Sequence, residues 1–289
     1  MRDLIGHTPL VKINYAFEQV EGVNLFAKLE YYNPSGSVKD RTGLYMVEDA
    51  IKDGRLKRGS TIVEATAGNT GLGVAFAALN QGFHVIFVVP EKFSEEKQIL
   101  MKALGADIIH TKREDGMLGA AAKAQELLSE IKDSISLQQF KNMSNPKAHY
   151  ETTGPEIYQD LDGKIDYLVA GAGSGGTYSG VVKFLKEQNR NIKGILADPV
   201  GSTMGGGEHA DYDIEGIGND FIADTMDMSL VDKVIKINDS QAFDGARALA
   251  RHEGILGGSS TGAAFSAALK LIYEHHVKGN IVFIAPDSG

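Results

Sequence analysis

The chain has 289 residues, of which 43% are apolar and 23% charged, and its formal net charge is −9. It has no cysteine, no block of Lys or Arg, no apolar run approaching the ~20 residues of a membrane span and no apolar signal core near its N-terminus. These features exclude disulfides, thiol catalysis and most structural zinc sites, and they argue against a nucleic-acid or membrane partner. A cytoplasmic enzyme of bacterial type fits this composition.

Short apolar runs alternate with helical patterns along the whole chain. The runs predict strands at residues 25–29, 62–65, 85–89, 108–111, 136–140, 167–170, 194–198, 233–237 and 281–285. Helices are predicted at residues 70–81, 95–104, 118–131, 176–188, 241–252 and 262–276. The second helix follows Ser94 and begins with two glutamates, which suit the positive end of its dipole. The alternation predicts an α/β fold of two open twisted sheets, mostly parallel, with helices on both faces.

A glycine-rich segment joins the predicted strand at 167–170 to the following helix, with the sequence Gly-Ala-Gly-Ser-Gly-Gly-Thr at 171–177. Glycines allow a sharp turn whose N–H groups converge on one anion, and the helix N-terminus adds partial positive charge. Ser174 and Thr177 add hydroxyl donors. A tight turn without a ligand is the alternative, but the pattern favours a phosphate site.

The same segment also satisfies the dinucleotide pattern G-x-G-x-x-G, through Gly171, Gly173 and Gly176. The next predicted strand ends at Asp198, close to where such a fold places its ribose-binding acid. A dinucleotide-binding fold normally opens with this unit, whereas here the unit lies past the middle of the chain. This position argues against a dinucleotide, but the pattern itself keeps an NAD-dependent oxidoreductase open as an alternative.

Lys39 lies in the segment Asn-Pro-Ser-Gly-Ser-Val-Lys-Asp-Arg-Thr at 33–42, between a strand and a helix. A lysine at a helix start opposes the dipole, and the positive helix end lowers the pKa of an amine. Such a placement suits a lysine that forms a Schiff base. A solvated surface lysine remains the alternative.

Two further strand-to-helix turns carry polar groups. In residues 64–71, Thr66, Asn69 and Thr70 form a donor-rich turn suited to a carboxylate, unless Asn69 or Thr70 merely caps the helix. In residues 257–262, Ser260 or Thr261 opens the last long helix and could likewise be only a cap. The eight histidines show no metal-ligand spacing, so no metal site is expected.

Together these segments resemble the cysteine synthase and cystathionine β-synthase family, the β-replacement branch of fold type II pyridoxal-phosphate enzymes, which are similar to the tryptophan synthase β chain. The resemblance runs from Ile-Gly-His-Thr-Pro-Leu at 5–10 to Pro-Asp-Ser-Gly at 286–289. It rests on several motifs in the same order. The family usually continues past the last motif, which suggests that a C-terminal tail is missing.

The resemblance implies a role for each motif residue around pyridoxal 5′-phosphate. Lys39 would be the Schiff-base lysine, and it would also be the catalytic base. The other cofactor-binding residues would be Asn69 at the ring hydroxyl, Ser260 at the pyridine nitrogen, and Gly173, Ser174, Gly175, Gly176 and Thr177 at the phosphate. The substrate carboxylate would be bound by Thr66, Gly68, Thr70 and Gln139. Ala67 stands where cysteine synthases have a serine that touches the substrate, so one carboxylate contact is missing or supplied otherwise.

The resemblance also implies a domain organisation. Residues 35–145 would form a smaller, mobile substrate-binding domain, and residues 1–34 with 146–289 a larger domain that binds the cofactor phosphate. The polar segment 142–146, which contains Pro146, is the expected hinge. A homodimer is the expected assembly.

The subtype is indicated by two segments, residues 198–202 and the motif Glu-Gly-Ile-Gly-Asn-Asp-Phe at 215–221. They resemble the cystathionine β-synthase side of the family, since cysteine synthases tend to carry glycine in place of Asp220. Asn219 replaces the tyrosine that commonly precedes this acid. Gly216 and Asp220 are thus expected at the substrate site.

The implied reaction is β-replacement on O-acetylserine or serine by homocysteine, which gives cystathionine through an aminoacrylate. The alternative within the family is a cysteine synthase that uses sulfide. Outside it, the alternatives are the NAD enzyme described above and a non-catalytic binding protein that keeps the motifs as relics.

Overall fold

The computed structural model describes residues 2–66, 68–91 and 95–289. The chain divides into two compact units. The small unit comprises Met1–Ile5 and Lys39–Asn145, and the large unit Gly6–Val38 and Pro146–Gly289. The chain passes from the small unit to the large unit between Asn145 and Pro146, inside the segment 142–146 that is the expected hinge. Ala67 and Ser94, on which two sequence inferences fall, lie outside the described residues.

The N-terminal residues differ from the sequence expectation, which put residues 1–34 with the larger half. Residues up to Ile5 belong to the small unit instead. The reason is local, because Arg2 donates to the carbonyl of Ala77 and its guanidinium lies 3.7 Å from the Glu48 carboxylate.

In the described part of the chain, the small unit contains a four-stranded sheet in the order β5-β4-β3-β6, with all pairs parallel. Its strands are β3 (Thr61–Ala65), β4 (His84–Pro90), β5 (Asp107–Thr111) and β6 (Ser134–Ile135). Its helices are α1 (Lys39–Lys52), α2 (Asn69–Ala78), α3 (Glu95–Ala103) and α4 (Gly116–Glu130). The short helix α5 (Ser144–Ala148) runs across the junction.

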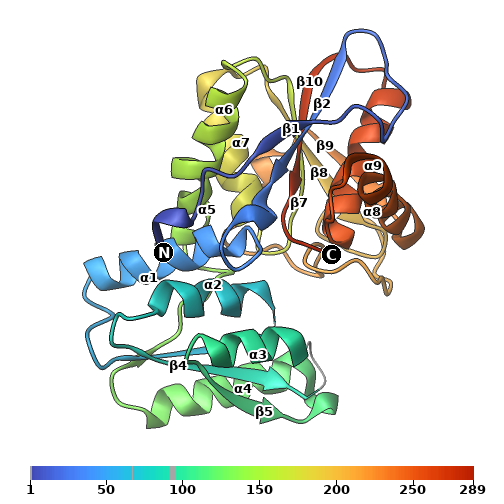
Figure 1. The fold of residues 1–289 in the computed structure, drawn as a ribbon. Coiled ribbons are helices and arrows are strands. Elements are labelled where there is room, and N and C mark those ends of the chain that lie inside the picture. The colour runs from blue at the N-terminus through green and yellow to red at the C-terminus, as the bar shows by residue number, and fades with distance from the viewer. Residues whose placement is uncertain (1, 67, 92–94) are drawn as a thin grey trace. The chain divides into compact units, whose positions relative to one another are not determined.

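Alternate residues of the central strands of the small unit enter two separate cores, as the period of two of a strand requires. Ile62 and Phe87 pack with the side chains of α1 and α2, together with Met101 of α3. Val63 and Val88 pack on the opposite face with residues of α4. Figure 1 shows these helices on the two sides of the sheet.

In the described residues of the large unit, six strands pair in the order β1-β2-β10-β7-β8-β9. They are β1 (Leu10–Lys12), β2 (Val23–Leu29), β7 (Tyr167–Gly171), β8 (Lys193–Pro199), β9 (Lys233–Ile237) and β10 (Gly279–Ala285). Only the β1–β2 pair among them is antiparallel. The helices are α6 (Gly154–Asp160), α7 (Gly176–Gln188), α8 (Asp239–Glu253) and α9 (Ser259–Tyr273). Figure 1 shows α6 and α7 on one side of this sheet and α8 and α9 on the other.

The core of the large unit follows the same alternation. Along β10, Phe283 packs with α8 and α9, while its neighbours Val282 and Ile284 pack with α6 and α7. The two outer helices meet at glycines: a Cβ on Gly262 would lie 1.9 Å from the Ala242 carbonyl oxygen. This close contact holds the first turns of α9, which include Ser260, against α8. The expected class, α/β with mostly parallel sheets and helices on both faces, is therefore confirmed.

Some expected elements are wrong in detail. Residues 136–140 form no strand, and the strand there is only β6 at 134–135. Helix α9 begins at Ser259 rather than at 262, and the three-residue strand β1 was not expected at all. No helix in the described part of the chain is long and apolar enough to cross a membrane.

Candidate active site

Lys39 is the first residue of α1 and is partly buried. Its main chain is held by a glycine contact between α1 and α2, the two helices that lie one above the other in Figure 1. A Cβ on Gly73 would lie 2.3 Å from the Lys39 carbonyl oxygen, and a Cβ on Gly43 would lie 2.4 Å from the Gly73 carbonyl carbon. Glycine is therefore required at both positions, and Lys39 is fixed against α2.

The N-terminus of α2 carries several of the other expected residues. Its N-cap is Gly68, which has no side chain, so Asn69 and Thr70 are the first two residues of the helix rather than its N-cap. Gly68 has open space where a Cβ would stand. The positive end of a ten-residue helix therefore lies at these residues and suits an anion.

Thr70 and Gln139, 69 positions apart in sequence, are in direct contact: the Thr70 hydroxyl donates to Gln139 Oε1 over 2.7 Å. Thr66 is buried, and its methyl group lies close to Gly71 of α2. The structure therefore brings together, within the small unit, residues expected to bind a carboxylate.

Glu64, which the sequence analysis did not select, holds the loop that contains Gln139. Its Oε1 accepts hydrogen bonds from the Ser136 hydroxyl (2.9 Å), the Leu137 N–H and the Gln138 N–H (3.0 Å). Burial raises the pKa of Glu64 above the usual carboxyl value, and these hydrogen bonds oppose the effect. A lone acid at the carboxyl end of an apolar strand, directly before the 66–70 turn, is the sequence signal that could have revealed it.

In the large unit, the glycine loop at 171–176 joins β7 to α7. Gly175, which has no side chain, is the N-cap of α7 with a φ of 81°. A Cβ on Gly173 would lie 2.5 Å from the Gly216 carbonyl oxygen, so the loop packs directly against the 216–221 segment. A helix start behind a left-handed glycine is a suitable anion site.

The residues around this loop are held by neighbouring side chains. The Thr177 hydroxyl lies 3.2 Å from Nε2 of buried His149, whose Nδ1 lies 2.9 Å from the Thr153 hydroxyl. The Ser174 carbonyl accepts from the Thr225 hydroxyl. His149 and Thr225 are contacts of the loop that the sequence analysis missed.

Ser260 is buried in the first turn of α9, whose N-cap is Gly258 without a side-chain cap in the described chain. The interpretation of Ser260 as a helix cap is therefore wrong. Its hydroxyl donates to Asp287 Oδ1 over 3.3 Å, which links it to the motif at 286–289. The neighbouring Thr261 hydroxyl is buried and has no hydrogen-bond partner among the described residues.

The segment 216–221 is tied to the glycine loop. The Gly218 N–H donates to the Ala172 carbonyl over 2.8 Å, and the Asn219 amide donates to the Gly173 carbonyl over 2.6 Å. Asp220 follows, with its Oδ1 2.9 Å from His209 Nδ1, and both side chains are more than half exposed. The partner of Asp220 is thus a histidine.

Asp198 does not have the environment of a ribose-binding acid. It is 1% exposed, and its Oδ2 accepts from Lys236 Nζ and from the Gly205 N–H over 3.0 Å. The acid of the dinucleotide pattern is therefore used in an internal ion pair.

Comparison with known proteins decides the family. The model of the family described as "Pyridoxal-phosphate dependent enzyme" matches residues 1–287. The chain belongs to this family. It is thus a pyridoxal-phosphate enzyme of the β-replacing type, and the NAD oxidoreductase alternative is wrong.

Three relatives illustrate the similarity. The chain is 50% identical to the O-acetylserine dependent cystathionine beta-synthase of Bacillus subtilis, over 99% of this chain and 93% of that protein. It is 43% identical to a cysteine synthase of Helicobacter pylori, over 99% and 94%. The crystal structure of an O-acetylserine dependent cystathionine beta-synthase from Helicobacter pylori matches with a TM-score of 0.92 and 43% identity, over 99% of this chain and 94% of that one.

The residues present fit the cofactor of this family. The start of α7 at Gly175 suits a phosphate, and the partly buried Lys39 at a helix start suits a Schiff base. Buried Ser260 offers a hydroxyl oxygen to a ring nitrogen. These are the chemical groups that the family's cofactor needs.

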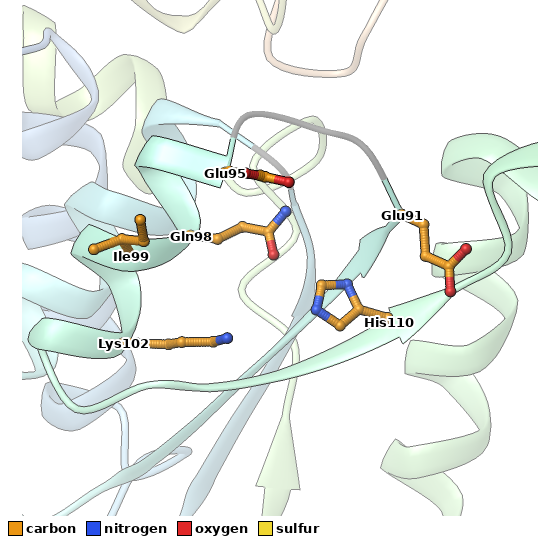
Figure 2. Close-up of a pocket in the computed structure, with 6 residues that line it drawn as sticks. All are labelled: Glu91, Glu95, Gln98, Ile99, Lys102 and His110. Atoms are coloured by element: carbon orange, nitrogen blue, oxygen red, sulfur yellow. The ribbon is translucent and has the colours of Figure 1, made fainter.

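A surface hollow of about 480 Å³ lies elsewhere in the small unit (Figure 2). It is lined by Glu91, Glu95, Gln98, Ile99, Lys102 and His110. None of the residues expected at the active site lines it. The hollow is thus separate from the chemistry described above.

Proposed function

We propose that this enzyme replaces the β-substituent of O-acetylserine, or of serine, with homocysteine and so forms cystathionine. Two relatives named as O-acetylserine dependent cystathionine beta-synthases support the proposal, at 50% and 43% identity over nearly the whole chain. The observation that carries it is the position of Asp220 on a segment hydrogen-bonded to the glycine loop.

In this proposal, Lys39 carries pyridoxal 5′-phosphate and exchanges the proton at the substrate Cα. The cofactor, when bound, delocalises the negative charge that develops at Cα. Its phosphate is held by the N–H groups and hydroxyls of Gly173–Thr177, with Thr177 oriented by His149. Asn69 contacts its ring hydroxyl and Ser260 its ring nitrogen.

The substrate carboxylate binds at the start of α2, to the donors of Thr66, Gly68 and Thr70 and to Gln139. Because Gln139 Oε1 accepts from Thr70, the group that the Gln139 amide offers to an anion is its NH2. Small-unit residues thus bind the substrate, and we propose that this unit moves to exclude water during the reaction.

The incoming thiol distinguishes the two activities of the family. Sulfide needs only space, whereas homocysteine brings an ammonium group and a carboxylate that must be desolvated. Asp220 would accept the ammonium, since its partner His209 is exposed and an exposed pair of this kind contributes little stability. Gly216, with a φ of 78° and no atom within 4 Å of a Cβ position, leaves room for the substrate.

The second candidate is a cysteine synthase that uses sulfide. One of the relatives from Helicobacter pylori is named a cysteine synthase. The test is a comparison of kcat/KM for O-acetylserine and serine, each with sulfide and with homocysteine, using purified enzyme. The proposal expects the highest value for O-acetylserine with homocysteine. A preference for sulfide at matched concentrations would support the second candidate.

A further inference from the structure

The carboxylate of Glu64 accepts three hydrogen bonds from residues 136–138, which directly precede Gln139. Glu64 is therefore placed to fix the position of Gln139. Glu64 is the fourth residue of β3, directly before the 66–70 turn, and Gln139 follows the loop that Glu64 holds. One side chain therefore joins the two chain segments that carry the proposed carboxylate-binding residues. All of these residues lie in the small unit.

The loop needs such an anchor, because it makes little regular structure. Gln138 has a φ of 53°, a conformation that residues other than glycine rarely adopt. Its N–H and that of Leu137 donate to Glu64 Oε1 rather than to a neighbouring strand. These two backbone donors are thus satisfied by a side chain, as the buried position of Leu137 requires.

The other end of the loop is held separately. The Asn145 amide donates to the Gln139 carbonyl over 2.9 Å, and Asn145 Oδ1 accepts from the Thr42 hydroxyl of α1 over 3.1 Å. The backbone of Gln139 is therefore held by Glu64 through the residues before it and by Asn145 at its own carbonyl. Gln139 contacts the start of α2 directly through Thr70, and the Glu64 side joins its backbone to the turn before that helix.

We propose that Glu64 is a positioning residue for substrate recognition, which holds Gln139 against Thr70 so that the amide meets the substrate carboxylate. This inference rests on the proposed function, since it assumes that the carboxylate binds at this turn. Glu64 makes no contact with substrate in the proposal. It acts through the 136–139 loop.

The test uses the holoenzyme and two ligands that differ only in the group of interest. L-alanine has a carboxylate and no β-leaving group, and L-alaninamide replaces the carboxylate with a neutral amide. Their dissociation constants are measured from the change in visible cofactor absorbance. The ratio of the two constants reports carboxylate recognition and is insensitive to a general loss of folded protein.

We expect Glu64→Ala to weaken L-alanine binding by about tenfold or more while L-alaninamide changes less than about twofold. Ser136→Ala, which removes one of the three donors, and Glu64→Gln, which keeps an acceptor oxygen, should give intermediate losses. Gln138→Gly is the matched control: it keeps the N–H and suits a positive φ, so its ratio should equal that of the wild type.

The outcomes are distinguishable. If the wild type prefers L-alanine and the Glu64 variants keep that preference, the inference is overturned while the proposed function stands. If the wild type shows no preference, the carboxylate site itself is wrong, and Glu64 loses its role with it. Should Glu64→Ala fail to fold, an equal loss for both ligands in Glu64→Gln and Ser136→Ala would overturn the inference.

Discussion

The Thr70 hydroxyl donates to the side-chain oxygen of Gln139 over 2.7 Å, across 69 positions of sequence. This contact orients the Gln139 amide so that its NH2 group is the one presented to an anion. The prediction is that Gln139→Leu raises KM for O-acetylserine by roughly ten- to a hundredfold, the value of a hydrogen bond to a charged group. Steady-state kinetics with saturating thiol measure it, and an unchanged KM would remove Gln139 from the site.

Lys39 provides the most severe test of the cofactor assignment. Lys39→Ala should lower turnover by at least about a hundredfold and remove the visible absorbance of a lysine-linked cofactor, without loss of the folded state. Lys52→Ala, at the other end of the same helix, is the matched control and should keep both properties. Retained activity in Lys39→Ala would show that another group carries the cofactor.

The phosphate loop is better tested at Thr177 than at Gly175. A side chain at Gly175 would be strained, because its φ is 81° and a Cβ there would lie 2.4 Å from Met226 Cβ. Thr177→Val removes only the hydroxyl that contacts His149. We expect about a tenfold rise in the dissociation constant of pyridoxal phosphate. Thr152→Val, which alters a hydroxyl bonded to the Ala148 carbonyl, should leave cofactor affinity unchanged.

The raised pKa of buried Glu64 gives a pH prediction for stability. The folded protein binds this proton more tightly than the unfolded chain, whose carboxyl titrates near pH 4.5. The contribution is therefore fully present below pH 4.5 and is lost as the pH rises through the folded-state pKa. The unfolding free energy of the wild type, relative to Glu64→Gln, should fall over this window. Denaturant titrations at several pH values measure it, and a relative gain with pH would contradict the shift.

Much of the fold could be predicted because burial imposes regular patterns. Helix α7 and strand β9 have the predicted bounds, since apolar spacing marks both elements and Gly175 marks the start of the helix. The strand predicted at 136–140 is wrong because its N–H groups donate to Glu64, a contact that depends on tertiary structure. The three-residue edge strand β1 is too short to leave a pattern.

The candidate site likewise combines residues that local sequence reveals with residues that depend on tertiary contacts. Lys39 and the glycine loop are recognisable because a helix start imposes local sequence requirements. The contacts argued for Glu64, His149 and Asp287 are made with partners that are 27 or more positions away, and no local pattern records such pairs. The partner of Asp220 also could not be predicted, because His209 lies in an irregular loop.

The proposed function assigns the choice between homocysteine and sulfide to Asp220. Asp220→Gly should lower kcat/KM for homocysteine by roughly ten- to a hundredfold and leave that for sulfide unchanged, because only homocysteine brings an ammonium group. His209→Gln is the control, since it removes the partner of Asp220 but keeps the carboxylate. It should retain the homocysteine reaction. A parallel fall for both thiols in Asp220→Gly would make Asp220 a structural residue.

The most direct measurement is a competition in one vessel. Purified enzyme is given O-acetylserine with equal concentrations of homocysteine and sulfide, and the ratio of cystathionine to cysteine is followed by mass spectrometry. We predict that cystathionine dominates with the wild type and that the ratio falls about ten- to a hundredfold with Asp220→Gly. A wild-type enzyme that forms mainly cysteine, with a ratio unaffected by Asp220→Gly, would contradict the proposed function.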